Sequence, residues 1–435
     1  MQHGDDDFPN QKRMRADFFD PGRIDDDADS NDRFRHDLLR PRSRRSLGFT
    51  GASLAAATLS LATSPASAAQ DLASSQILVD ELGATDDERL AMLNRLARET
   101  GGQGAQTFVL SNRIYQTSTP IRLYSGLKII GTSGQPAREY NGGTTIRWDG
   151  KPNTSIFEFP TDDRRRGNYP ADGSPRDITL SGILFEGGQH GSDTDVFPKL
   201  DMTSASIRGQ TLWYCTLHNL AVRDMRTFWW GYGTGVSLTG TFHGQAMHET
   251  PFFIGGSENT IFGTEAQSFL DNNSPAWKSS TKPFLRSVMQ KSYIGRCIIT
   301  ARRNAHHISV EGGRGLFISG VQFDAPNTDP TNGSAIKVTR VEGLSITNCV
   351  FYASMNRPKS GRGIIDISGG QEITISDNQF IKYRRSMDEP LSDTPIVFSS
   401  AATPVKIGLN NYVGYSGVIL GSAQSIDPSV RVHPI

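Results

Sequence analysis

The sequence is short of several features that would each point to a particular class of protein. Its 435 residues carry a formal net charge of +0, which gives no reason to expect nucleic acid or a membrane surface as the main partner. Beyond the N-terminal segment no stretch reaches ~18 uninterrupted apolar residues, so a membrane span in the mature chain is not expected. Aromatic residues make up only 9% of the chain, against 44 glycines, which is typical of a turn-rich β protein.

The sequence does contain a repeat, in four blocks of its C-terminal half. The blocks read GLFISGVQFDA (315–325), GLSITNCVFYA (343–353), QEITISDNQFIK (371–382) and PVKIGLNNYVGY (404–415). An isoleucine recurs at steps of 28, 29 and 32 residues, and an aromatic residue follows each isoleucine at an offset of five. These residues are Ile318, Ile346, Ile375 and Ile407, then Phe323, Phe351, Phe380 and Tyr412. A short β-rich unit with such a period predicts a β-solenoid, which buries one continuous core between stacked coils.

A second isoleucine column, one strand earlier in each coil, has steps of 28, 29 and 31 residues. Its members are Ile308, Ile336, Ile365 and Ile396. We expect each coil to hold a strand, a tight bend, a second strand, an Asn-rich bend, a third strand and a variable loop. The second bend should contain Asn348, Asn378 and Asn410-Asn411, because asparagine tolerates the left-handed backbone conformation that such a bend needs.

Cysteine is rare, and Cys215 lies far from the other two in sequence. Cys297 and Cys349 occupy equivalent repeat positions, with Val321 between them. Stacked strands lie ~4.8 Å apart, so the pair would sit two coils, or roughly 10 Å, apart. That separation exceeds the reach of a disulfide, and we expect buried thiols that fill the stack.

Residues 1–69 are expected to lie outside the fold. A polar, partly acidic stretch leads to Arg44-Arg45, an apolar segment (LGFTGASLAAATLSLAT) and the small residues Ala66-Ser67-Ala68. This order is typical of a cleaved twin-arginine export signal, which predicts a secreted or cell-envelope protein. The alternative is a chance arginine pair ahead of an alanine-rich linker.

Residues 70–105 are predicted to cap the solenoid that follows at 106–435. Thr85 and Glu88 have the spacing of a capping box, which predicts a helix over 86–100. Its apolar face consists of Leu90, Leu93, Leu96 and Ala97. A lone amphipathic helix in this place would cover the open end of the core and block edge pairing.

The segment after the helix resembles the pectate-lyase-like superfamily of right-handed parallel β-helices. The resemblance covers roughly residues 77–420, and the family's usual Pro-Pro-Gly is Ser111-Asn112-Arg113 in this chain. It is carried by Asp86-Asp87, Phe108-Val109-Leu110, Arg113-Ile114-Tyr115 and SGLKIIG (125–131). The resemblance implies an all-β fold: a right-handed parallel β-helix solenoid with an N-terminal capping α-helix. This superfamily holds lyases, hydrolases, epimerases and non-catalytic phage tailspikes, so it does not by itself imply one activity.

The outward side of the first strands is the first candidate site. Alternate strand residues share a face, so Ser309, Lys337, Asp366 and Val397 form one outward column, with Glu311 diagonal to Lys337. The resemblance places a substrate groove on this strand face. In a polysaccharide lyase, Lys337 would remove the proton next to a uronate carboxylate, and Arg362 or Arg357 would stabilise the enolate-like charge. The alternative is a cross-strand ion pair on a solvated face, worth ~0.2–1 kcal/mol.

A hydrolase and a metal site are two further interpretations. Asn327-Thr328-Asp329 resembles the first catalytic element of polygalacturonase-type hydrolases, although the further elements of that family are absent in register and a plain turn is the alternative. Asp329, with Arg357 and Arg384 in other variable loops, is a candidate substrate-binding residue. No cofactor is expected, since a calcium cage needs more carboxylates than Asp366 and Glu311 supply.

The densest aromatic cluster, FWWGYG (228–233), is the second candidate site. Trp229, Trp230 and Tyr232 could stack on sugar rings, which have apolar C–H faces and polar edges. The alternative is a plug of the core beneath a loop.

Two classes of function remain open. One is an exported enzyme, a polysaccharide lyase acting on an acidic glycan or a glycoside hydrolase. The other is a non-catalytic glycan-binding or structural protein, since GGSENTIFGTEAQSFLDNNSPAW (255–277) resembles phage and prophage β-helix proteins, including tail-associated ones. Both classes take a polysaccharide as partner, and the second resemblance allows a homotrimer as well as a monomer.

Overall fold

The computed structural model describes one compact unit, within residues 64–435. Residues 1–63 form the other unit, and the predicted export signal lies outside the described residues. The described residues are 76–100, 106–132, 143–160, 174–200, 202, 211–245, 247–262, 266–268, 282–300, 306–325, 334–354, 363–383, 395–398, 405–415, 419–420, 425–426 and 431–433.

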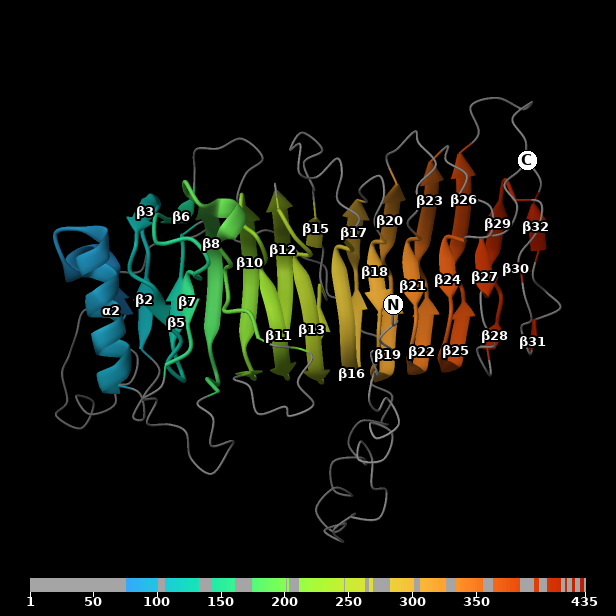
Figure 1. Cartoon of the computed structure of the whole chain (residues 1–435), viewed down its shortest axis with the longest axis horizontal. Helices are drawn as coiled ribbons and strands as arrows, with labels where there is room; N and C mark the ends of the chain where they lie inside the picture. Colours follow the sequence, from blue (N-terminus) through green and yellow to red (C-terminus); the bar gives the residue numbers. More distant parts are fainter. Residues whose placement is uncertain are drawn as a thin grey trace, which may run out of the picture. The chain divides into compact units, whose positions relative to one another are not determined.

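The strands of this unit stack in parallel, coil upon coil, as Figure 1 shows between α2 and β32. The first and second strands of the coils belong to a 23-stranded sheet, and the third strands of the later coils form a 7-stranded sheet. The most regular coils follow the sequence repeat. They comprise β18 (Ile308–Val310), β19 (Arg314–Ser319), β20 (Gln322–Ala325), β21 (Ile336–Val338), β22 (Glu342–Thr347), β23 (Val350–Ser354), β24 (Ile365–Ile367), β25 (Gln371–Ser376), β26 (Gln379–Tyr383), β27 (Ile396–Phe398), β28 (Val405–Ile407) and β29 (Asn411–Val413).

The stack extends beyond these coils in both directions along the chain. After them come β30 (Ile419–Leu420), β31 (Ser425–Ile426) and β32 (Arg431–His433). Before them come β1 (Gln76–Leu78), β2 (Thr107–Val109), β3 (Ile114–Thr117), β4 (Ile121–Arg122), β5 (Lys128–Ile130), β6 (Thr144–Trp148), β7 (Phe157–Glu158), β8 (Thr179–Gly187), β9 (Leu212–Trp213), β10 (Thr216–Arg223), β11 (Trp229–Thr234), β12 (Ser237–Gln245), β13 (Phe252–Ser257), β14 (Thr260–Ile261), β15 (Ala266–Ser268), β16 (Leu285–Gly295) and β17 (Cys297–Thr300). Two short 3-10 helices, η2 (Val79–Leu82) and η4 (Gly191–Asp193), interrupt them.

The predicted columns of the repeat are confirmed residue by residue. Both isoleucine columns pair in register from coil to coil, and all their members are buried. The aromatic column forms a face-to-face stack, with ring centres 4.8, 4.7 and 5.0 Å apart and planes within 9° of parallel. Offset stacking of this kind adds ~0.5–1.5 kcal/mol per pair beyond the area that each ring buries.

The bend after the second strand differs from the prediction by one residue. Asn348 has the expected positive φ of 54°, but in the next coil the left-handed residue is Asp377, with a φ of 60°. Asn378 is buried beside it, where its Oδ1 accepts the Cys349 N–H at 2.9 Å. Asn410 repeats this arrangement, accepting the Asn378 N–H at 2.9 Å. The prediction for Asn378 and Asn410 is therefore wrong: their amides satisfy buried backbone groups instead of relieving a left-handed turn.

The helix α2 (Asp86–Thr100) lies where the sequence predicts it. The capping box forms, with Glu88 N donating to Thr85 Oγ1 at 3.2 Å and Thr85 N donating to Glu88 Oε2 at 3.0 Å. Leu90, Leu93 and Ala97 are buried in the same core as the first coil. The helix therefore extends the apolar core beyond the first coil, as a cap should.

The paired aspartates at the start of α2 fasten the helix to the first coil. Asp87 Oδ1 accepts hydrogen bonds from Thr117 Oγ1 at 2.6 Å, Ser118 N at 2.8 Å and Thr119 N at 2.9 Å. Burial alone would raise the pKa of Asp87, but these hydrogen bonds outweigh it and lower the pKa below its usual value. Asp86 is held similarly by Arg113, and its pKa is lowered as well.

Candidate functional site

The outward residues of the first strands form one continuous line across the unit. We name it the first-strand row. Backbone pairing joins its members in the order Trp230, Phe253, Arg286, Ser309, Lys337, Asp366 and Val397. The strands that carry them, β11, β13, β16, β18, β21, β24 and β27, follow one another along the stack in Figure 1. The row thus brings the predicted aromatic cluster and the predicted charged column onto one surface.

The aromatic end of the row is built by Trp230 and Phe253. Their rings meet edge to face, with centres 5.2 Å apart. Lys199 places its Nζ 4.5 Å from the centre of the Trp230 ring, and Arg286 places its guanidinium carbon 4.0 Å from that of Phe253. These cation–π contacts hold the two rings between positively charged groups.

Each of these cations is also bound by a carboxylate. Arg286 donates two hydrogen bonds to Glu311, at 2.8 and 2.7 Å. Glu249 pairs with Lys199 at 3.0 Å and with Lys282 at 3.1 Å. Burial would raise the pKa of Glu249, but the two lysines outweigh it and lower the pKa. The aromatic end is therefore a fixed arrangement of rings and ion pairs, with rotamers set before any ligand arrives.

The three aromatic candidates do not share one environment. Trp229 is 2% exposed and lies in the core, so it acts as a plug and cannot contact a sugar; this part of the prediction is corrected. Trp230 and Tyr232 alternate with it and lie on the outer side, partly exposed. The Tyr232 ring lies across Gly255 of the next coil, where a β-carbon would come within 2.5 Å of the ring. Only glycine leaves room for that ring to lie along the sheet.

The charged end of the row follows the predicted register. Lys337 pairs with Ser309 on one side and Asp366 on the other. Asp366 is only 9% exposed, so this part of the row is not the open, solvated face that the alternative interpretation assumes. Glu311 was expected to lie diagonal to Lys337, but its carboxylate is engaged by Arg286 of the preceding coil and by Ser309 Oγ at 3.0 Å. Glu311 therefore orients Arg286.

Four candidates cannot be placed. Arg362, Arg357, Arg384 and Asp329 lie outside the described residues. Among the residues that are described, no group of three or more His, Cys, Asp and Glu side chains could hold a metal ion. His248 lies within the described part and its Nε2 contacts Asp224 Oδ1 at 2.6 Å.

Four members of the site were not identified from the sequence: Lys199, Glu249, Phe253 and Arg286. The steps from Trp230 to Phe253, Arg286 and Ser309 are 23, 33 and 23 residues, which obscures their equivalence. The available signal was alternation in PFFIGGS and LRSVMQ, read backwards from Ser309.

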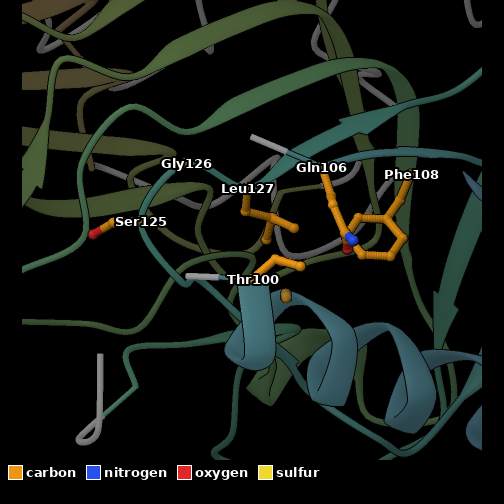
Figure 2. A pocket seen from close by; sticks show the side chains of 7 residues that line it. Thr100, Gln106, Phe108, Ser125, Gly126 and Leu127 are labelled. Carbon is orange, nitrogen blue, oxygen red and sulfur yellow. The ribbon is translucent and has the colours of Figure 1, made fainter. Parts of the chain in front are cut away.

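A small cavity lies at the other end of the unit, between α2 and the first coil. Figure 2 shows Gln106, Phe108 and Leu127 around the end of α2 that carries Thr100. Its empty volume of about 190 Å³ is well below the ~300–1,000 Å³ of ordinary ligand sites. We therefore regard it as a packing gap beneath the cap.

Comparison with solved structures bears on the fold. A variant of the tailspike protein of E. coli bacteriophage HK620, in complex with a hexasaccharide, has a TM-score of 0.56 at 8% identity, covering 85% of this chain and 67% of the tailspike. The chain is a right-handed parallel β-helix. ORF18 of Geobacillus virus E2 matches at a TM-score of 0.45 and 12% identity over 79% of this chain, which spans 62% of that protein's length. The A-module of the Azotobacter vinelandii mannuronan C-5 epimerase AlgE6 matches at 0.44 and 10% identity, over 82% of this chain and 100% of the module.

At these identities the likeness establishes the fold alone. No protein-family model matches the sequence, and no curated protein matches it either. No helix in the described ranges is long and apolar enough to cross a membrane.

Proposed function

We propose that this protein binds a polysaccharide along the first-strand row. The observation that carries the proposal is the Trp230–Phe253 platform, which lies partly exposed in line with Arg286, Lys337 and Asp366. Aromatic faces take up the apolar side of a sugar ring, and charged groups beside them accept hydrogen bonds from, or donate them to, its hydroxyls.

The dimensions of the row also support an extended ligand. It crosses six inter-coil steps of ~4.8 Å, so it is ~29 Å long. Each coil offers one outward side chain at a constant interval, an arrangement that fits a chain of repeating units better than a single small molecule. The tailspike with the same fold was crystallised with a pentasaccharide and with a hexasaccharide, which makes an oligosaccharide a natural first probe.

The test is a screen of immobilised glycans, followed by calorimetric titration of the best binder. Trp230→Ala should weaken binding at least ~10-fold, because removal of a central aromatic anchor costs ~2 kcal/mol or more. Tyr214→Ala is the matched control, since Tyr214 is a 54% exposed aromatic outside the row, and it should leave affinity unchanged. No binding across neutral and acidic glycans, or equal losses in both variants, would refute the proposal.

A second candidate is cleavage of the bound polymer, with Lys337 as the base of a lyase. The register that sets Lys337 between Ser309 and Asp366 on the row favours it over the other candidates. Incubation with uronic-acid polymers should then produce the ultraviolet absorbance of an unsaturated uronate, and Lys337→Ala should abolish it while binding persists. A silent assay with intact binding would leave the non-catalytic function standing. Export by the twin-arginine route is part of this proposal, because an extracellular polysaccharide must be reached from outside the cytoplasm.

A further inference from the structure

The second strands present a different face, with its own outward row. Backbone pairing joins ten positions in this row, and charge occurs only at the two ends. The members are Lys128, Thr179, Thr216, Ser237, Thr260, Tyr293, Phe317, Ser345, Thr374 and Lys406. We name this row and its neighbours on the same strands the second-strand face.

The adjacent outward row is also uncharged apart from one histidine. It consists of Ser181, His218 and Thr239 in the earlier coils and of Gly295, Ser319, Thr347 and Ser376 in the later ones. Charged residues make up 21% of the chain, so a solvent-facing surface of this length would ordinarily carry several. Depletion of charge is what distinguishes the centre of a protein–protein interface from the rest of a surface.

Two aromatic residues lie near the middle of the face. Phe317 is 54% exposed, unusual for a phenylalanine on a regular strand. Tyr293, its partner in the preceding coil, lies flat across Gly295 and donates a hydrogen bond from its hydroxyl to the Ser319 carbonyl at 3.1 Å. The centre of the face is thus a level apolar patch from which the Phe317 ring projects.

The later coils leave this face open on both sides. Only Gly320 and Val321 separate β19 from β20, and only Asn348 and Cys349 separate β22 from β23. The bends before the second strands are equally short, as between β21 and β22. No loop of these described segments can therefore fold over the face, and a flat partner can approach it.

The edge of the face carries the charge that its centre lacks. Arg314 and Glu342 pair across β19 and β22 at 3.3 Å, with exposed side chains. On the opposite edge Arg296 and Asp377 are exposed. An uncharged centre with a charged rim is the usual anatomy of an interface between proteins.

We propose that two copies of this chain pair face to face through the second-strand face. A single flat surface suits an isologous pair, in which both copies use the same patch about a two-fold axis. An axis between Tyr293 and Phe317 sets each Phe317 against the partner's Tyr293 and brings no two lysines together, because Lys406 then faces the partner's Thr216.

The available area fits such a pair. From Thr216 to Lys406 the row covers seven steps, and with strands about six residues wide the flat area is roughly 34 × 20 Å, or ~700 Å² per copy. A standard stable interface buries ~800 Å² per partner. The face is therefore of the size that a specific dimer requires.

Sedimentation equilibrium of the full chain tests the proposal. The wild type should sediment as a dimer at micromolar concentration, and Phe317→Lys should raise the dissociation constant at least ~30-fold, as loss of an interface hot spot does. Tyr352→Lys is the matched control, since Tyr352 is also exposed but lies on the third strand β23, and it should remain dimeric. Thr374→Lys, which adds charge to the row without removing an apolar group, should weaken the dimer as well and covers the case in which Phe317→Lys does not fold.

Other outcomes overturn the proposal. A wild type that is monomeric throughout removes it, as does a trimer, which cannot be built from one isologous face. Loss of glycan binding in folded, monomeric Phe317→Lys would assign the face to a sugar ligand instead. None of these results depends on the first-strand row, which Trp230→Ala tests separately.

Discussion

Arg286 holds Glu311 by two hydrogen bonds, Nε to Oε1 at 2.8 Å and Nη2 to Oε2 at 2.7 Å, while its guanidinium carbon lies 4.0 Å from the centre of the Phe253 ring. The fork geometry fixes the guanidinium plane, and the plane fixes the aromatic ring beneath it. Glu311 therefore contributes to the candidate site by orienting Arg286, on which the shape of the aromatic end depends.

Glu311→Gln should reveal that role. Loss of the charged acceptor should reduce the free energy of unfolding by about 1–2 kcal/mol, discounted for the partial exposure of both side chains, and should weaken glycan binding. Glu342→Gln is the control, because its partner Arg314 is 67% exposed and the pair should be worth less than ~0.5 kcal/mol. Urea unfolding of the two variants decides it: equal effects would reduce Arg286–Glu311 to an ordinary surface pair.

The aromatic stack should be a major source of stability in the later coils. Phe351 lies between Phe323 and Phe380 and is 1% exposed, so Phe351→Ala should cost ~3–5 kcal/mol. The adjacent Tyr352 points outward at 40% exposure, and Tyr352→Ala should stay within ~0.5 kcal/mol of wild type. Denaturant midpoints that fail to separate these neighbours would mean that the stack tolerates a vacancy.

Asn378→Ala should be costly although it removes few atoms. The substitution leaves the Cys349 N–H and the Ile346 carbonyl without their partner in a buried bend, at ~1–3 kcal/mol for each group. Asp377→Gly, one residue earlier, should be neutral or slightly stabilising, because glycine adopts the φ of 60° without strain. Thermal unfolding of both variants tests the assignment, and a harmless Asn378→Ala would contradict the ladder.

The N-terminal cap should loosen in acid. The pKa values of Asp86 and Asp87 are lowered in the folded chain, so their contribution to stability is present above the usual carboxyl range and is lost as the pH falls through the lowered values. Hydrogen exchange of the Gln116, Ser118 and Thr119 amides, which donate to these carboxylates, should speed up in that window.

The matched variants for the cap are Asp87→Asn and Glu99→Gln. The first should speed exchange of the Ser118 and Thr119 amides already at neutral pH, since an amide oxygen is a weaker acceptor than a carboxylate. Glu99 is exposed at the other end of α2, and its variant should behave as wild type. Uniform acid sensitivity along the whole stack would contradict a local effect at the cap.

The thiols should be inert in the native protein. Burial raises the pKa of Cys215 to about 12 and that of Cys349 to about 12, so neither forms a thiolate at neutral pH. A thiol reagent should titrate all three cysteines only after denaturation, with or without reductant. Fast native labelling of Cys349 would show that the later coils open readily.

The sequence alone determined the architecture of the later coils. A constant step of about one coil, carried by two isoleucine columns and one aromatic column, permits only one register, and pairing of Ile336 with Ile365 and of Phe351 with Phe380 followed directly. The capping box at Thr85 was equally local, because its donors and acceptors lie within one turn.

Only the tertiary structure decided the site. The steps between Trp230, Phe253 and Arg286 are unequal, so their alignment depends on backbone hydrogen bonds between coils of different length and not on a sequence period. The same holds for the partner of Glu311, which lies one coil earlier than the diagonal rule suggested, and for Trp229, whose core position follows from the pleat of β11. A repeat specifies what stacks within regular coils; where the coil length varies, side chains meet according to how the strands pair in space.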